Sequence, residues 1–234
     1  MTTSSKRPEH VAWASLILSV VFFGLGFFLG RWSGFFAVSI VGWLSLAAAL
    51  IWLVLAVQFH QRALAEQERL DTGRLLAERQ DSTIFEPGAE RAAVFDAAQR
   101  RLATLEKWFI PIFSAVIAAY ELVLGLLLLR AIPTNVSAGE SPPFLLCAVC
   151  MTAVAFLSFL MSRYATGMSA QRQWKPLRAG GSFLLGLAVF CFVLAVGLAL
   201  ANFQVLAVVT VLNFAGPIVM VVLGVETALN VVLD

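Results

Sequence analysis

The stretch Trp108–Ala131, WFIPIFSAVIAAYELVLGLLLLRA, decides how the rest of the chain is interpreted. It is apolar and long enough to cross a bilayer as a helix, which takes about 20 residues. Glu121 nevertheless stands a little past its midpoint, and the long polar segment 60–107 comes directly before it. This stretch therefore joins a part of the chain that lies in lipid to a part that lies in water.

The composition places the chain among membrane proteins. Of the 234 residues, 60% are hydrophobic and 13% are charged, whereas a soluble domain carries roughly 25% charged residues. The apolar runs are continuous instead of short and alternating, which indicates helical spans and excludes a transmembrane β-barrel. The net charge of +2 is too small to indicate a nucleic-acid partner. The bilayer is the expected environment.

Six such apolar runs are found when the chain is followed outward from this stretch. The predicted spans are residues 11–30, 35–59, 108–131, 144–162, 182–201 and 205–233. The expected fold class is therefore all-α, a polytopic bundle of six transmembrane helices.

The expected organisation has three parts that together make one membrane domain. Residues 1–59 hold a short N-terminal tail and two spans, 60–107 are polar, and 108–234 hold the other four spans. The last span stops at Asp234 with no basic residue or polar tail behind it. We therefore expect the sequence to be a fragment of a longer protein.

The distribution of Lys and Arg predicts the orientation. Nearly all of the 16 basic residues lie in the N-terminal tail, in 60–107 and in the connection 163–181. Only Arg31 and Arg130 fall on the other side, so the positive-inside rule puts both termini in the cytoplasm. We expect an integral protein of the bacterial cytoplasmic (inner) membrane. Aromatic residues at the predicted interfaces agree with this, namely Trp13, Trp32, Trp108 and Tyr164.

The polar segment 60–107 is expected to form a cytoplasmic helical hairpin between the second and third spans. Its two halves are separated by residues 81–88, which end in the helix breaker Pro87-Gly88. Apolar residues in the second half follow a coiled-coil-like heptad spacing. The alternative is a pair of amphipathic helices lying on the membrane surface. Ile84 and Phe85, at the hairpin tip, are the expected contact with a protein partner or a second copy of the chain.

Polar residues inside the predicted spans mark a candidate ion site. An acidic residue at a helix centre costs roughly 2.5–3.5 kcal/mol on insertion scales, so Glu121 should face the bundle and hold a partner or a proton. Glu226 is shallower, and Asn230 lies one turn from it. Pro217 would free the carbonyl of Asn213, a group that can bind cations in a broken helix. The alternative is a protonated carboxyl that only helps the helices to assemble.

Two further patterns involve small residues. Cys147 and Cys150 form a C-x-x-C pair near the outer end of the fourth span, which suggests redox chemistry, although buried cysteines commonly act as small apolar residues. Gly26, Gly30 and Gly34 are spaced by four, which predicts close packing between helices.

Three functions are compatible with these features. The first is an interaction or scaffold subunit that presents the hairpin. The second is a proton- or cation-coupled channel or transporter subunit that uses Glu121 and Glu226. The third is a membrane thiol oxidoreductase that uses Cys147 and Cys150. The chain has no catalytic-metal cluster and no nucleotide motif, so we expect no metal, no cofactor and no enzymatic activity otherwise.

Overall fold

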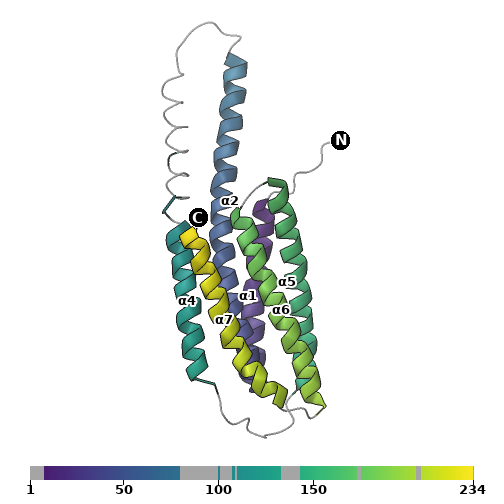
Figure 1. The fold of residues 1–234 in the computed structure, drawn as a ribbon. Helices are drawn as coiled ribbons and strands as arrows, with labels where there is room; N and C mark the ends of the chain where they lie inside the picture. Colours follow the sequence, from purple (N-terminus) through teal and green to yellow (C-terminus); the bar gives the residue numbers. More distant parts are fainter. Residues whose placement is uncertain are drawn as a thin grey trace.

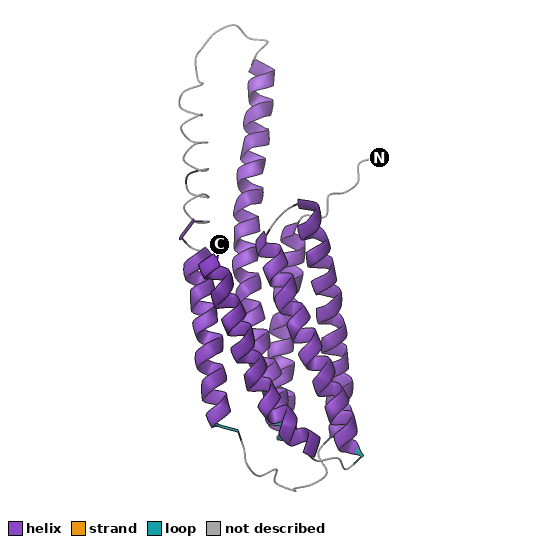
Figure 2. Ribbon diagram, viewed as in Figure 1, coloured by secondary structure: helices purple, strands orange, loops and turns teal. Residues whose placement is uncertain are grey.

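The computed structural model describes residues 8–79, 100, 107–108, 110–132, 143–172, 175–203 and 207–233. These residues are 96% helical and include no strand. Six of the helices within this part of the chain are long and apolar enough to cross a membrane. The prediction of an all-α six-helix membrane bundle is confirmed (Figures 1 and 2).

The helices correspond one to one with the predicted spans. Their bounds are α1 Pro8–Ser33, α2 Phe36–Arg79, α4 Ile110–Arg130, α5 Phe144–Arg172, α6 Lys175–Asn202 and α7 Ala207–Leu233. The bounds of α4 start two residues after the predicted start of the third span, and Phe109 between them lies outside the described residues. Pro111 lies in the first turn of α4, where its missing N–H costs no intrahelical bond.

The connection between the fourth and fifth spans differs from its prediction. Residues 163–181 were expected to be a polar linker, but α5 continues to Arg172 and α6 already begins at Lys175. The two helices remain paired there, because Ser162 Oγ donates a hydrogen bond of 2.6 Å to the carbonyl of Gly181. Ala165 and Leu177, both buried, extend the apolar contact into this region. A hydropathy profile misses such a continuation because the outward faces are polar.

α2 is longer than any bilayer is thick. Its 44 residues span about 66 Å at 1.5 Å per residue, against about 30 Å for the hydrocarbon core. Its candidate membrane span ends at Gln61. The helix continues and projects well beyond its neighbours, and we call this end of the bundle the projecting end (Figure 1). The expected boundary between residues 59 and 60 lies inside this continuous helix. Apart from residues 100 and 107, the second half of the predicted hairpin lies outside the described residues, as do Ile84 and Phe85 at its expected tip.

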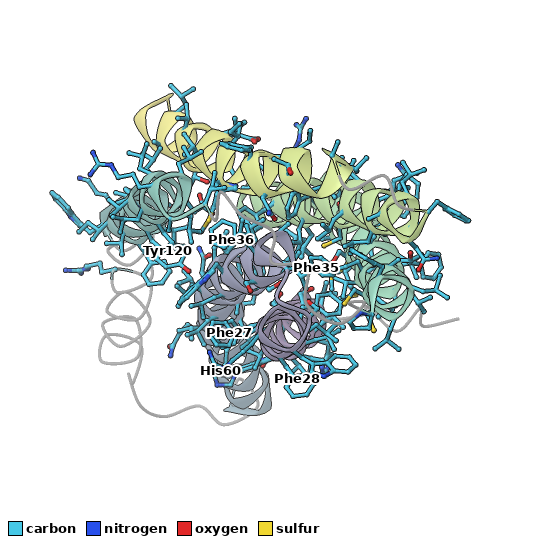
Figure 3. All side chains as sticks on the ribbon, turned by 90° about the horizontal axis from the view of Figure 1, so that it is seen from below. Phe27, Phe28, Phe35, Phe36, His60 and Tyr120 are labelled. Carbon is cyan, nitrogen blue, oxygen red and sulfur yellow. The ribbon has the colours of Figure 1, made fainter. Side chains whose placement is uncertain are left out.

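The bundle is built from three antiparallel helix pairs, α1–α2, α5–α6 and α4–α7. α2 and α6 form the centre, with 61% and 56% of their spans buried, whereas only 22% of the α4 span is buried. Seen along the bundle, α4 lies at one edge, beside α7 (Figure 3). The third pair therefore joins two helices that are far apart in the sequence.

Glycines hold α1 against α2. A methyl group added at Gly26 would lie 2.6 Å from the backbone nitrogen of Gly42, and one at Gly30 would lie 2.6 Å from that of Ser39. These two residues pack as the spacing predicted. Gly34 differs, because nothing lies within 4 Å of its added methyl group. It forms the turn between the helices with φ of 72°, a conformation that glycine adopts without steric cost.

Candidate functional site

Glu121 lies where α4 and α7 pack closely against each other. Its side chain is 0% exposed, although α4 as a whole is the least buried span. A methyl group added at Gly224 would lie 3.0 Å from Cβ of Glu121, so α7 has no side chain at the point where it crosses the acid. One turn along α4, a methyl group at Gly125 would lie 2.8 Å from the side chain of Val221. We call the residues Glu121, Gly125, Gly224 and Thr227 the acidic seam.

Thr227 is the polar partner of Glu121 across the acidic seam. Its Oγ1 lies 3.3 Å from Oε2 of Glu121 and 2.9 Å from the carbonyl oxygen of Leu223 in its own helix. The other carboxyl oxygen, Oε1, is buried and has no hydrogen-bond partner among the described residues. Glu121 forms no salt bridge within the described part of the chain. A buried carboxyl with one long hydrogen bond and no counter-ion is costly if it is ionised.

The neighbouring residue Tyr120 connects α4 to the centre of the bundle. Its hydroxyl donates a hydrogen bond of 3.3 Å to the backbone carbonyl of Trp43 in α2. In Figure 3 Tyr120 lies between α4 and α2. Two consecutive residues of α4 therefore contact two different helices, Tyr120 contacting α2 and Glu121 contacting α7.

The structure does not bring Asn213 to this site. Its Oδ1 accepts a hydrogen bond of 3.1 Å from the backbone N–H of Ala37, in the first turn of α2. Along α7, Asn213 and Thr227 are about 21 Å apart at 1.5 Å per residue. The helix also continues through Pro217, so no unwound segment presents its carbonyls to an ion. The side chain of Asn213 therefore caps α2.

The other predicted site residues are placed as follows. Glu226 is exposed on α7, next to Thr227, and Asn230 belongs to α7 but its side chain is outside the described residues. Cys147 is buried and Cys150 partly buried in α5, and both are free thiols. No group of three or more His, Cys, Asp or Glu side chains that could hold a metal occurs in the part of the chain covered by the structure.

The sequence prediction missed the two glycines of the acidic seam and the role of Thr227. Gly125 stands four residues from Glu121, so both lie on one face of α4. This spacing was available in the sequence. Gly224 and Thr227 could not have been assigned, because nothing local in α7 indicates that it packs against α4.

No protein-family model, curated protein or solved structure matches this chain. The fold and the composition define it as a polytopic integral membrane protein, and the site must be interpreted from its own chemistry.

Proposed function

We propose that this protein is a membrane-anchored interaction subunit that presents α2 and the hairpin it begins to a protein partner or to a second copy. The observation that carries this proposal is the continuity of α2 from Phe36 to Arg79. About 27 Å of this helix, residues 62–79, extends beyond the predicted span. In the orientation favoured by the basic residues, with both termini in the cytoplasm of a bacterial inner membrane, this arm is cytoplasmic.

The base of the arm is firmly held, which suits a presenting role. α2 is the most buried span, and Trp52 is completely buried against Gly180 of α6. Where α2 leaves the bundle, Nδ1 of His60 lies 2.9 Å from Oε1 of Glu9 in the first turn of α1. A helix fixed along its membrane part defines the direction of its projecting part.

The test changes the expected hairpin tip. Ile84→Asp combined with Phe85→Asp should abolish complex formation in native membranes, measured by chemical crosslinking and native electrophoresis. The matched control is Ser82→Asp combined with Thr83→Asp, which adds the same charge at neighbouring polar positions and should leave the complex intact. Complex formation by the Ile84/Phe85 variant at the level of the control would reject docking through the tip.

A second function, a proton- or cation-coupled channel or transporter subunit, is favoured by one observation. The carboxyl of Glu121 is completely buried mid-span and has an oxygen without a partner. Intramembrane ionisable groups of this kind commonly serve ion pathways. In liposomes, Glu121→Gln should abolish pH-dependent flux, with Glu226→Gln tested beside it. Normal flux through the Glu121→Gln protein would remove Glu121 from the mechanism.

A further inference from the structure

We infer that the ligand of the acidic seam is a proton, held by Glu121, and not a metal cation. This inference names the ion of the second function proposed above and rests on that function for its physiological role. Proton occupancy itself is a property of the α4–α7 contact and can be measured without any transport assay.

The hydrogen-bond geometry around Thr227 favours a neutral carboxyl. A threonine hydroxyl carries a single hydrogen, and two acceptors lie near it. The carbonyl of Leu223, at 2.9 Å, is closer than Oε2 of Glu121, at 3.3 Å. A threonine in a helix commonly donates to the carbonyl four residues earlier. If the Thr227 hydroxyl donates its hydrogen to the Leu223 carbonyl, it can only accept a hydrogen bond from Glu121. Glu121 can donate that bond only when its carboxyl is protonated.

A metal cation does not fit the same seam. Hard cations take about six or more oxygen ligands, whereas the described contacts provide the Glu121 carboxyl and one hydroxyl, that of Thr227. α4 and α7 approach closely on both sides of this carboxyl, since a methyl group added at Gly224 or Gly125 would lie 3.0 Å or less from the facing helix. α7 keeps its helical hydrogen bonding here, so its carbonyls are engaged within the helix. A proton needs none of these ligands.

Within the described residues, no neighbouring positive charge would stabilise the ionised acid. On α4 the adjacent titratable group is Tyr120, which is directed to α2, and on α7 it is Glu226, itself an acid. The described membrane part of α2 contains no Lys or Arg, and that of α6 contains only Arg178, near its start at the projecting end. Loss of the proton would leave a buried anion with Oε1 unpaired. The seam is therefore closed when Glu121 is protonated and weakened when it is not.

Infrared spectroscopy of the protein in lipid vesicles tests this directly. The neutral carboxylic acid has a carbonyl stretching band that ionised carboxylates lack. Exposed carboxyls are ionised at neutral pH, since their ordinary titration range is near pH 4, so one buried neutral acid should stand out among the 14 Asp and Glu residues. The wild-type protein should show this band at neutral pH. Glu121→Gln should remove it, and Glu226→Gln should leave it in place.

The acceptor is tested with two variants of Thr227. Thr227→Val, which has nearly the same shape, should shift the band to higher frequency because the acid loses its acceptor, whereas Thr227→Ser should preserve the frequency. A wild-type spectrum without the band would overturn the inference, as would a band that persists in Glu121→Gln. So would replacement of the band by carboxylate absorption when Na⁺ or K⁺ is added at constant pH.

Thermal unfolding provides an independent readout, since Glu121→Gln copies the shape and neutrality of the protonated acid. The wild-type midpoint should fall between neutral and alkaline pH as the proton leaves, and this loss should be smaller in Glu121→Gln. Equal losses in the two proteins would count against the inference.

If the infrared band behaves as expected and flux survives in Glu121→Gln, the transport function fails while the proton site stands. If Glu121→Gln loses flux but the wild-type protein shows no neutral-acid band, the proton site fails while the transport function stands.

Discussion

The α1–α2 and α4–α7 helix pairs are both packed closely at glycines, but only the α4–α7 pair encloses an ionisable side chain. In each pair, glycines let two antiparallel backbones approach until an added methyl group would collide with the partner helix. In α1–α2 the contacts at Gly26 and Gly30 are with Gly42 and Ser39, and no ionisable group is enclosed. In α4–α7 the contact encloses Glu121. Close packing therefore serves only cohesion in the first pair and also shields a carboxyl in the second.

The two pairs also differ in how they are supported. α1 and α2 are joined by a two-residue turn, and α2 is buried on several sides by other helices. α4 lies at the edge, connected to α7 through the acidic seam and to α2 through Tyr120. We expect α4–α7 to be the weaker pair.

The largest loss is expected at Gly30. Its added methyl group would meet the backbone of Ser39, which cannot rotate away, so Gly30→Ala should lower the free energy of unfolding by about 3 kcal/mol, the upper part of the overpacking range. Denaturation in detergent, followed by circular dichroism, measures the loss. Gly24→Ala in the same helix is the control, because nothing lies within 4 Å of its added methyl group. Equal effects of the two substitutions would show that α1–α2 is loosely packed.

A smaller loss is expected at Gly224 in the acidic seam. The nearest groups to its added methyl are Cβ of Glu121 and the side chain and nitrogen of Leu122, all at 3.0–3.1 Å, and α4 can shift slightly at the edge of the bundle. Gly224→Ala should therefore destabilise by about 1.5 kcal/mol under the same conditions. Gly167→Ala, at a glycine with open space, is the matched control. A loss equal to that of Gly30→Ala would contradict the expected difference between the pairs.

The contact of Asn213 with α2 should contribute about 1 kcal/mol, as helix-capping side chains do. Asn213→Ala removes the acceptor of the Ala37 N–H. Asn213 is only 4% exposed, so water does not readily replace this acceptor. Asn202→Ala, at an exposed residue near the end of α6, serves as the control. If Asn213 instead bound a cation, its substitution would change stability only when that cation is present, which a titration with Na⁺ and K⁺ would reveal.

The smallest change is expected for Tyr120→Phe, which removes one hydrogen bond between α4 and α2. Hydrogen bonds between membrane helices contribute about 0.6 kcal/mol on average. The measured loss should be near this value, with the same helical content. A loss as large as that of Gly30→Ala would show that Tyr120, and not the acidic seam, holds α4 in place.

Some features followed from local sequence and others did not. The six apolar helices and the place of Glu121 within the third of them were predicted correctly, because each depends on the residues of one segment. The extension of α5 to Arg172 and the early start of α6 at Lys175 were missed, since the mixed composition of these turns does not reveal that Ala165 and Leu177 are buried. The assignment of Gly34 to packing was corrected for a related reason. Equal spacing along the chain does not distinguish a glycine that a neighbour touches from one that forms a turn.

By itself, the sequence determined that this is an all-α membrane protein with six spans and that one of them carries a central acid. Membrane spans are recognised from the hydropathy and charge of about 20 consecutive residues, so they can be predicted without knowledge of the fold. The contacts of Glu121 with Gly224 and Thr227, and of Asn213 with the start of α2, became visible in the folded protein. These contacts depend on the fit between the surfaces of helices far apart in the chain, and no local pattern specifies which surface meets which.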